Sequence, residues 1–327
     1  MVKRTVLCSD DPHVFERELV TLYRCGEYEF ALQMTLQSIQ KFMDLRQLGF
    51  YWSARLHSRL GRADQALGAL QAGLADGHWW SDVLLLHNDL SGLRGHEGFP
   101  DVLAESTRRA VIACAAANSK VIVRPPRSGN VNAPLLLALH GRGVEASKFA
   151  MHWRAASIEA DVLLAVPQST QMLADGLYCW DDFERGKREV LAAYREVALT
   201  YSFDPTRIIL AGFAQGGDLA IRLTLDGTVE QARLFLAVAP TMRGVSADTH
   251  YVGAGQGSRR SNTHTQGWIG VGALSSTRTG CEHFTQASCS QGHSVRLSLI
   301  EGMTDEFSHS AGTRLGGEVV DLLERSQ

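Results

Sequence analysis

The sequence of 327 residues lacks any apolar run long enough to cross a membrane, and it lacks an N-terminal apolar stretch of signal-peptide length. Its formal net charge is −3, and no basic patch reaches the scale that a nucleic acid or an anionic membrane surface would require. We therefore expect a cytoplasmic protein that binds neither nucleic acid nor membranes.

The cysteines and histidines show none of the spacings that metal sites need. There are six cysteines, without a CxxC pair or a Cys/His ligand pattern, so we expect neither a structural zinc ion nor a disulfide framework. Cys281 and Cys289 lie in a polar, His-containing segment and are the two candidates for a reactive thiol. The chain also lacks a Walker loop and a strand-linked G-x-G-x-x-G motif. We therefore expect no cofactor and no metal.

What the sequence does contain is typical of a soluble globular protein, with 45% hydrophobic and 20% charged residues. A chain of this length is long for one compact domain and comfortable for two. Apolar residues recur at three- and four-residue spacing from Phe15 to about Ser106, and the period changes after Ala117. This change predicts a helical domain at residues 1-115 and a second domain at residues 116-327.

Two segments of the helical region match each other. Residues 22–32 align with residues 57–67, so that glycine falls on glycine and alanine on alanine at the same offset of 35 residues (Gly26 with Gly61, and Ala31 with Ala66). This spacing resembles the tetratricopeptide repeat, in which a small residue lies where two helices cross closely. A third, degenerate unit is expected at residues 79–103. So short an array favours a structural cap or a self-association surface over a peptide-binding groove.

The second region alternates apolar strands with helical stretches such as residues 187–197. Uninterrupted apolar strands of this kind predict a parallel sheet covered on both faces. We expect strands at residues 120–126, 135–139, 162–166, 207–211, 234–238, 268–271 and 295–300.

One stretch of this region, Ile209–Ala220, organises the rest. An apolar run breaks into G-x-A-x-G and then resumes with helical periodicity, which predicts a strand, a sharp turn and a helix. Glycines two residues before and two after the central position relieve crowding around one strained residue, whose side chain points into a pocket. Here that residue is Ala214, which has no nucleophilic atom.

Five motifs follow one another along the second region: Pro134–Gly143, Ala165–Ser169, Cys179–Asp182, Asp204–Gly217 and Ala237–Thr241. Their order resembles the phospholipase/carboxylesterase branch of the α/β-hydrolases. The resemblance implies an α/β-hydrolase fold, with a mostly parallel sheet and helices on both faces. The helical front is similar to a tetratricopeptide-like domain fused to some members of that branch, which makes the fold class α/β preceded by an all-α region.

The same resemblance implies that the Ser-Asp-His triad is replaced. Ala214 stands where the family has serine, Ser275 where it has aspartate, and Asp305 where it has histidine. A methyl, a hydroxyl and a carboxylate in these places cannot form an acyl-enzyme in the usual way. An irregular segment at residues 251–264 could shift the register of the last two positions. Substitutes for the missing base are therefore also considered, namely His283, His293 and His309.

The remaining pocket of the family is retained. The resemblance implies an oxyanion hole formed by the backbone N–H groups of Arg142 and Gln215, and such donors stabilise an enolate or a phenolate as well as a tetrahedral intermediate. Asp305 would then supply acid/base chemistry, with Ser275 as an auxiliary group. The residues expected to border the substrate are His140, Trp180, Asp181, Thr241 and Glu306.

Three functions are compatible with this pattern. The first is an enzyme that carries out a non-hydrolytic step, such as cyclisation, isomerisation, elimination or C–C bond formation, on a small natural-product-like substrate. The second is a non-catalytic pseudo-hydrolase that binds a protein partner or associates with itself through the helical repeats. The third is a serine carboxylesterase or thioesterase carrying an inactivating change at Ala214. The altered positions 275 and 305 favour the first two.

Overall fold

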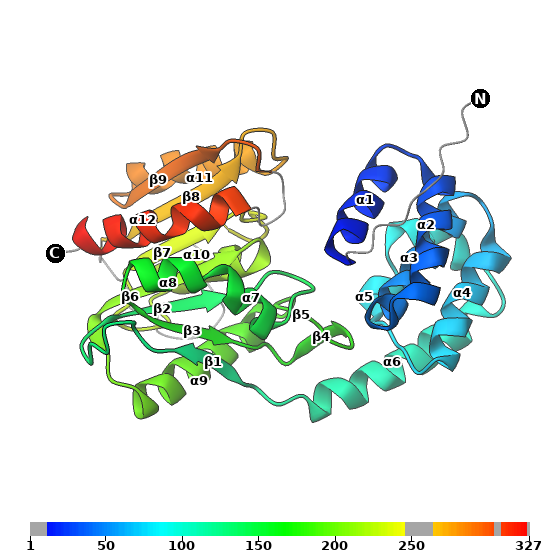
Figure 1. Cartoon of the computed structure of the whole chain (residues 1–327), viewed down its shortest axis with the longest axis horizontal. Coiled ribbons are helices and arrows are strands. Elements are labelled where there is room, and N and C mark those ends of the chain that lie inside the picture. The colour runs from blue at the N-terminus through cyan, green and yellow to red at the C-terminus, as the bar shows by residue number, and fades with distance from the viewer. Residues whose placement is uncertain (1–11, 246–263, 304–308, 326–327) are drawn as a thin grey trace. The chain divides into compact units, whose positions relative to one another are not determined.

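The computed structural model describes residues 12–245, 264–303 and 309–325 (Figure 1). Contacts divide the chain into two units. A helical unit comprises Met1–Ala116 together with Met172–Asp175, and an α/β unit comprises Ala117–Gln171 together with Gly176–Gln327. Each unit is described by itself.

The helical unit begins with two helical hairpins and ends with a less regular segment. Within the described residues, no helix of either unit has the length and apolar character needed to cross a membrane. The elements of the helical unit are α1 (Pro12–Arg24), α2 (Tyr28–Lys41), η1 (Met43–Leu45), α3 (Arg46–Arg59), α4 (Ala63–Ala75), α5 (Asp82–Leu85), η2 (Asn88–Leu93) and α6 (Phe99–Ala116).

The two segments that match in sequence also have the same conformation. Gly26 and Gly61 both follow the first helix of a hairpin with positive φ, 78° and 73°. In each case the N–H of the next residue bonds back to a carbonyl five residues earlier, a C-terminal arrangement that favours glycine. Ala31 and Ala66 are both fully buried. The offset of 35 residues therefore holds for turn and packing alike.

The third segment is less regular than the hairpins, because two short helices precede the long α6. It is tied to them through Asp89, which is 7% exposed. The Asp89 carboxylate accepts hydrogen bonds from the Tyr23 hydroxyl at 2.7 Å and from Arg55 Nε at 2.8 Å. A buried carboxylate needs such donors, so this polar contact fixes η2 against α1 and α3.

The α/β unit contains a seven-stranded sheet in the order β1-β3-β2-β6-β7-β8-β9. Strand β1 is antiparallel to β3, and the other neighbours are parallel. Strands β4 and β5, which were not predicted from the sequence, lie outside this sheet on either side of Gly176 (φ 69°), and all of β4 except Gln171 is counted with the helical unit. The strands are β1 (Val121–Arg124), β2 (Pro134–Leu139), β3 (Leu163–Pro167), β4 (Gln171–Ala174), β5 (Leu177–Cys179), β6 (Asp204–Phe213), β7 (Leu234–Val238), β8 (Gln266–Gly272) and β9 (Ser294–Ile300).

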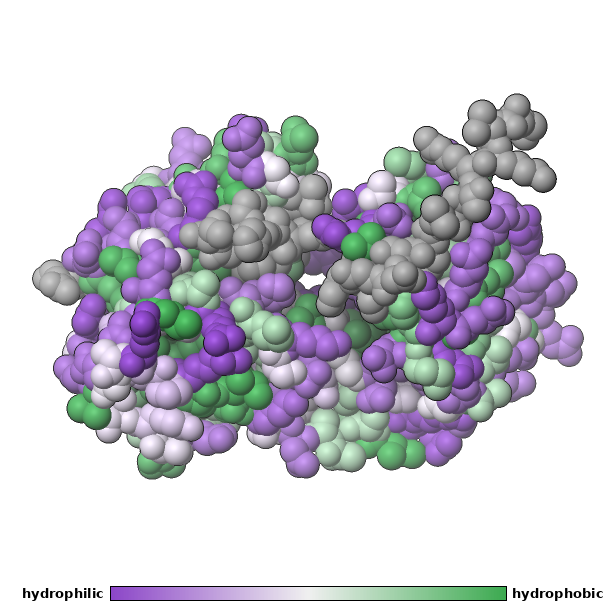
Figure 2. Space-filling model, in the orientation of Figure 1, coloured by the Kyte–Doolittle hydropathy of each residue, from purple (hydrophilic) through white to green (hydrophobic). Residues whose placement is uncertain are grey.

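Helices cover both faces of the sheet (Figure 1). One face packs against α7 (Ala146–His152), α8 (Arg154–Glu159) and α12 (His309–Arg325). The other packs against α9 (Phe183–Thr200), α10 (Gln215–Leu225) and α11 (Arg278–Ser290). Alternate residues of each strand enter the two cores, which is why the strands are apolar throughout. Hydrophilic residues are interspersed with apolar ones on the face of each unit that Figure 2 shows.

Candidate active site at the turn between β6 and α10

The turn at Ala214 joins the carboxyl end of β6 to the start of α10. Ala214 has φ 49° and ψ −117°, a conformation that a residue with a Cβ rarely adopts. Its N–H donates to the carbonyl of Val238 at 2.9 Å, and its carbonyl accepts from the N–H of Asp218 at 3.1 Å. The sharp strand-to-helix turn predicted from the sequence is therefore formed, with a methyl group as its central side chain.

The glycines around Ala214 are needed because backbones meet there. A Cβ on Gly216 would fall far inside van der Waals contact with the carbonyl oxygens of Leu139 and His140, and one on Gly212 would overlap the backbone of Gly216. A Cβ on Gly141 would come within 2.9 Å of the Phe213 ring. The loop after β2 is thus pressed directly against the turn.

This close approach brings the two expected oxyanion donors onto neighbouring loops. Arg142 follows β2 and Gln215 is the first residue of α10. The N–H of a first helical residue has no acceptor within its own helix. In the described part of the chain neither N–H has a hydrogen-bond acceptor. Two such donors beside one strained residue can hold an oxygen that becomes negatively charged.

The side chains of the same two residues meet at Asp181. Arg142 forms an ion pair with the Asp181 carboxylate, and Gln215 Nε2 donates to it at 2.7 Å. Gln215 Oε1 in turn accepts from the N–H of Trp180 at 2.8 Å. Arg142 and Asp181 are about one-third exposed, at 35% and 31%. The structure therefore brings three of the predicted site residues together in one polar cluster.

His140 has a different environment from the one expected of a substrate contact. Its side chain is fully buried, with Nδ1 2.9 Å from the Gly141 carbonyl and Nε2 accepting from the N–H of Ser169 at 3.2 Å. Burial lowers the pKa of His140 to about 4, so the ring is neutral at pH 7. Both nitrogens are used within the protein, and the ring supports the loops instead of facing a ligand.

Trp180 and Thr241 also act within the protein. Trp180 is 4% exposed, stacks on His140 with ring centroids 4.7 Å apart, and donates from Nε1 to the His140 carbonyl at 2.9 Å. The hydroxyl of Thr241 donates to the Asp218 carboxylate. Trp180 is thus buried with its N–H used inside the protein, whereas Thr241 is half-buried.

Asp218, which the sequence analysis did not single out, is the principal buried acid near the turn. It is 4% exposed on the first turn of α10 and accepts from the N–H of Met242 at 2.8 Å as well as from Thr241. Burial raises its pKa to about 6, although these hydrogen bonds oppose the shift. The sequence feature that could have identified Asp218 is a single acidic residue near the start of a mostly apolar helix.

The roles predicted for Asp305, Glu306 and Ser275 stay predictions. Asp305 and Glu306 lie outside the described residues. Ser275 lies beyond β8, where its hydroxyl is 3.1 Å from that of Thr277.

The candidate replacement histidines are placed elsewhere. His283 is exposed on α11, and His293 accepts from the Thr265 N–H at 3.3 Å, at the end of the sheet opposite the turn. The side chain of His309 lies outside the described residues.

The two candidate thiols, Cys281 and Cys289, differ in burial. Cys281 is fully buried, and burial raises its pKa to about 11, which disfavours the reactive thiolate. Cys289 is exposed, with Sγ 3.5 Å from the Val295 carbonyl. The described residues contain no group of three or more His, Cys, Asp or Glu side chains that could hold a metal ion.

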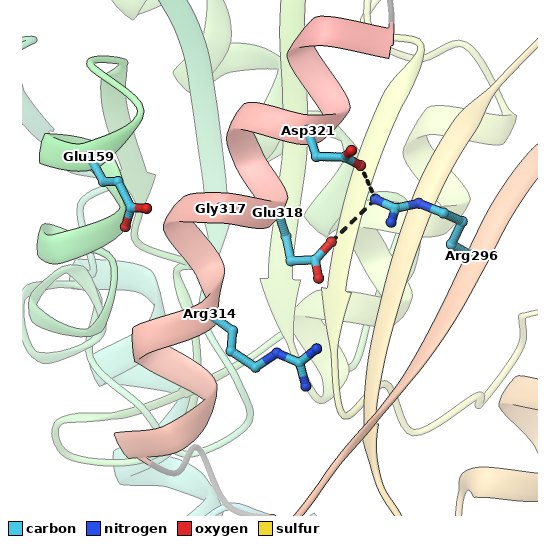
Figure 3. Close-up of a pocket in the computed structure, with 6 residues that line it drawn as sticks. All are labelled: Glu159, Arg296, Arg314, Gly317, Glu318 and Asp321. Carbon is cyan, nitrogen blue, oxygen red and sulfur yellow. Dashed lines mark hydrogen bonds and ion pairs between the residues drawn. The ribbon is translucent and has the colours of Figure 1, made fainter.

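A cavity of about 340 Å³ lies away from the turn, between α8, β9 and α12. Figure 3 shows Arg296 reaching from β9 toward two carboxylates of α12. Arg296 is 3.2 Å from Glu318 and also pairs with Asp321. Strands β7 and β8 separate β9 from β6 in the sheet. This cavity is therefore distinct from the turn and its loops.

No protein-family model matches the sequence, and no curated protein matches it either. Among solved structures, the chain is similar to an uncharacterized protein from Bacillus cereus ATCC 10987, with a TM-score of 0.51 and 18% identity over 96% of this chain and 99% of that one. A Bacillus cereus carboxylesterase gives a TM-score of 0.46 and 16% identity, over 66% of this chain and 97% of its own. The thermophilic carboxylesterase EstE1, from a metagenomic library, gives a TM-score of 0.47 and 15% identity, over 67% of this chain and 95% of its own.

The α/β unit has the α/β-hydrolase fold, preceded in the chain by the helical unit. The sheet order, the antiparallel first strand and the strained turn after β6 agree with the predicted fold class. Identities this low concern the fold alone and carry no activity over from the neighbours.

Proposed function

We propose that the α/β unit is an enzyme that transforms a small carbonyl compound without forming an acyl-enzyme. The single observation that carries this proposal is Ala214, which holds the strained geometry of a nucleophile turn with no nucleophile on it. Strain at a non-glycine residue costs of order 1–3 kcal/mol and is concentrated at functional sites. Relaxed constraint on an unused site would favour glycine at this position.

The two N–H donors define the chemistry that remains. Without a serine, Arg142 and Gln215 can still stabilise negative charge on a carbonyl or phenolic oxygen. Non-hydrolytic steps such as isomerisation, elimination or cyclisation pass through an enolate or phenolate and need no covalent bond to the protein. The replaced triad positions Ser275 and Asp305 support the same proposal, because they remove the partners that would activate a serine.

This proposal is tested by binding of p-nitrophenol, whose phenol and phenolate forms have different absorption spectra. The N–H pair favours the anionic oxygen, so we expect the pKa of the bound phenol to be lower than that of the free compound. Ala214→Leu places a larger side chain in front of the donors and is expected to abolish the shift. Leu274→Ala, at a residue 96% exposed beyond β8, is the matched surface control.

Either of two results would count against the proposal. One is a wild-type protein that leaves the phenol titration unchanged. The other is an Ala214→Leu variant that shifts the titration as the wild type does. Circular dichroism of each variant separates loss of binding from loss of folding.

We also propose that the helical unit contains two tetratricopeptide-like repeats that bind a protein partner or a second copy of the chain. The support is the shared conformation of Gly26 and Gly61 and the burial of Ala31 and Ala66. Light scattering of the full chain over a range of concentrations tests self-association. A mass equal to one chain at every concentration would remove that part of the proposal.

A further inference from the structure

Asp181 occupies a special position, because it is held by the side chains of the two residues whose N–H groups form the candidate oxyanion hole. Gln215 Nε2 donates to Asp181 Oδ1 at 2.7 Å, and Arg142 pairs with the same oxygen. The side-chain amide of Gln215 and its backbone N–H belong to the same residue. A carboxylate that contacts the amide therefore lies one glutamine side chain away from the position where the backbone N–H would hold a substrate oxygen.

The orientation of the Gln215 amide is fixed by its other contact. Its oxygen accepts from the backbone N–H of Trp180 at 2.8 Å, and a backbone N–H can only donate. The amide nitrogen must therefore face Asp181, as it does here. The hydrogen bonds from Arg142 and Gln215 both fall on Oδ1, so a proton can be taken at Oδ2 without breaking either of them. The Cys179 thiol is the other side chain that contacts this carboxylate.

The other carboxylates around the turn have structural tasks. Asp182 Oδ1 accepts the N–H of Arg185 at 3.0 Å and caps α9. Asp218 is buried against Thr241 and Met242. Glu189 accepts from Ser169 and Thr170 and pairs with Arg185. Asp181, at 31% exposure, is the acid that a molecule entering the site could reach.

We propose that Asp181 is the general base of this site and that the substrate class is a small carbonyl compound with an acidic C–H bond next to the carbonyl. This inference rests on the proposed function, because it needs an oxygen held by the N–H pair of Arg142 and Gln215. The sequence analysis assigned the acid/base role to Asp305, and this inference assigns it to Asp181, whose contacts the structure describes. Arg142 keeps its charge near the developing anion.

The proposed step balances without any co-reactant. The Asp181 carboxylate takes the proton, and the C–H bond breaks. Its electron pair forms a carbon–carbon double bond, and the carbonyl pair moves onto the oxygen held by the two N–H groups. Return of the proton from Asp181 to another carbon gives an isomer, whereas loss of a leaving group completes an elimination. The enolate charge is stabilised in a site whose donors are already in place.

Nitrobenzisoxazole is a probe for this arrangement, because a carboxylate removes its ring C–H proton while the N–O bond breaks. The C–H electrons form a nitrile and the N–O electrons become a coloured phenolate that the N–H pair can hold. General-base catalysis typically contributes about 10²–10⁴-fold, so Asp181→Asn is expected to lower kcat/KM by at least about 10²-fold. Asp182→Asn, which keeps a good helix cap, is expected to leave the rate within about twofold of the wild type.

Chemical rescue separates a base from a merely structural residue. Formate added to Asp181→Ala is expected to restore part of the lost rate, since it can occupy the space of the missing carboxylate. Formate is not expected to change the rate of Asp182→Ala. An Asp181→Asn variant as fast as the wild type, a wild type no faster than an equal concentration of acetate, or no rescue by formate would overturn the proposal.

The p-nitrophenol titration distinguishes this failure from failure of the proposed function. If Asp181 were not the base but the oxyanion site were formed, the pKa of bound p-nitrophenol would still be lowered in both the wild type and Asp181→Asn. Loss of the shift in the wild type would instead remove the oxyanion site on which the base depends.

Discussion

The turn at Ala214 and the cavity beside α12 are both lined by glycine and by charged side chains, yet they are built in opposite ways. At the turn, Gly216 has no room for one more carbon, because the carbonyls of Leu139 and His140 lie against it. At the cavity, a Cβ on Gly317 would meet nothing within 4 Å. Backbone packing fixes the turn, whereas partly exposed ion pairs line the cavity.

This difference explains how the turn can keep its backbone geometry with alanine at position 214. The strained backbone at Ala214 is held by its neighbours, so replacing a side chain there leaves the N–H groups where they were. The cavity is lined by side chains such as Arg296, which is 34% exposed, so that water competes with Arg296 for the carboxylates of Glu318 and Asp321. Four substitutions test this contrast between the turn and the cavity.

The largest effect is expected from Gly216→Ala. The added carbon must displace the backbone of the loop after β2, so we expect a loss of at least about 3 kcal/mol in the free energy of unfolding, or no folded protein. Gly317→Ala is the matched control in open space on α12, where alanine is expected to add about 0.5–1 kcal/mol. Urea denaturation measures the free energy of unfolding of both variants. Equal changes in the two variants would show that the turn is no more tightly packed than the cavity.

The next effect concerns pH and Asp218. Its pKa in the folded protein is raised to about 6 from 3.8, so the stability that it contributes is present below pH 3.8 and is lost as the pH rises through about 6. Asp218→Asn cannot titrate. Lowering the pH from about 6 to about 4 is therefore expected to stabilise the wild type relative to the variant by about 2 kcal/mol.

Urea denaturation of the wild type and Asp218→Asn at matched pH values measures this difference. Taking the difference cancels the opposing contribution of neutral, buried His140, which is common to both proteins. A difference that stays constant with pH would show that Asp218 does not titrate as its burial implies.

Ala214→Gly tests the strain directly and is expected to have a smaller effect. Glycine adopts φ 49° and ψ −117° without the Cβ penalty, but it also gains freedom in the unfolded chain. We expect a net gain of about 1 kcal/mol in the free energy of unfolding. A melting temperature that this substitution leaves unchanged or lowers would mean that the turn is not strained.

The smallest effect is expected from Arg296→Gln in the cavity. The ion pairs with Glu318 and Asp321 are partly exposed, and such pairs are worth about 0–1 kcal/mol. The free energy of unfolding is expected to change by less than about 1 kcal/mol. A loss as large as that of Gly216→Ala would show that the cavity is as tightly determined as the turn.

The sequence predicted the strands and the turn because their signals are local. Each predicted strand of the sheet coincides with an observed one to within a few residues, since uninterrupted apolar runs have few alternatives. Strands β4 and β5 were missed because strands of four and three residues carry too little pattern. The degenerate third segment was expected as helices but not as the short α5 and η2.

The site was harder to predict, because a motif names a residue without giving its surroundings. His140 stands in a motif that predicted a substrate contact, yet both of its nitrogens are bonded within the protein. Asp181 was expected only to border a substrate, and its pairing with Arg142 and Gln215 joins residues 39 and 34 positions apart in the chain. Contacts of that range leave no trace in local spacing.

Hydrolysis of a p-nitrophenyl ester by Ala214→Ser decides between the proposed non-hydrolytic site and an inactivated esterase, with the wild type and Asp181→Asn measured in parallel. If the proposed function is correct, no acid and base serve the turn, so the new serine is expected to give neither a burst nor turnover above the wild type. Robust multiple turnover by Ala214→Ser would contradict the proposed function, because it would mean that an acid and a base still serve this turn and that the protein is an inactivated esterase.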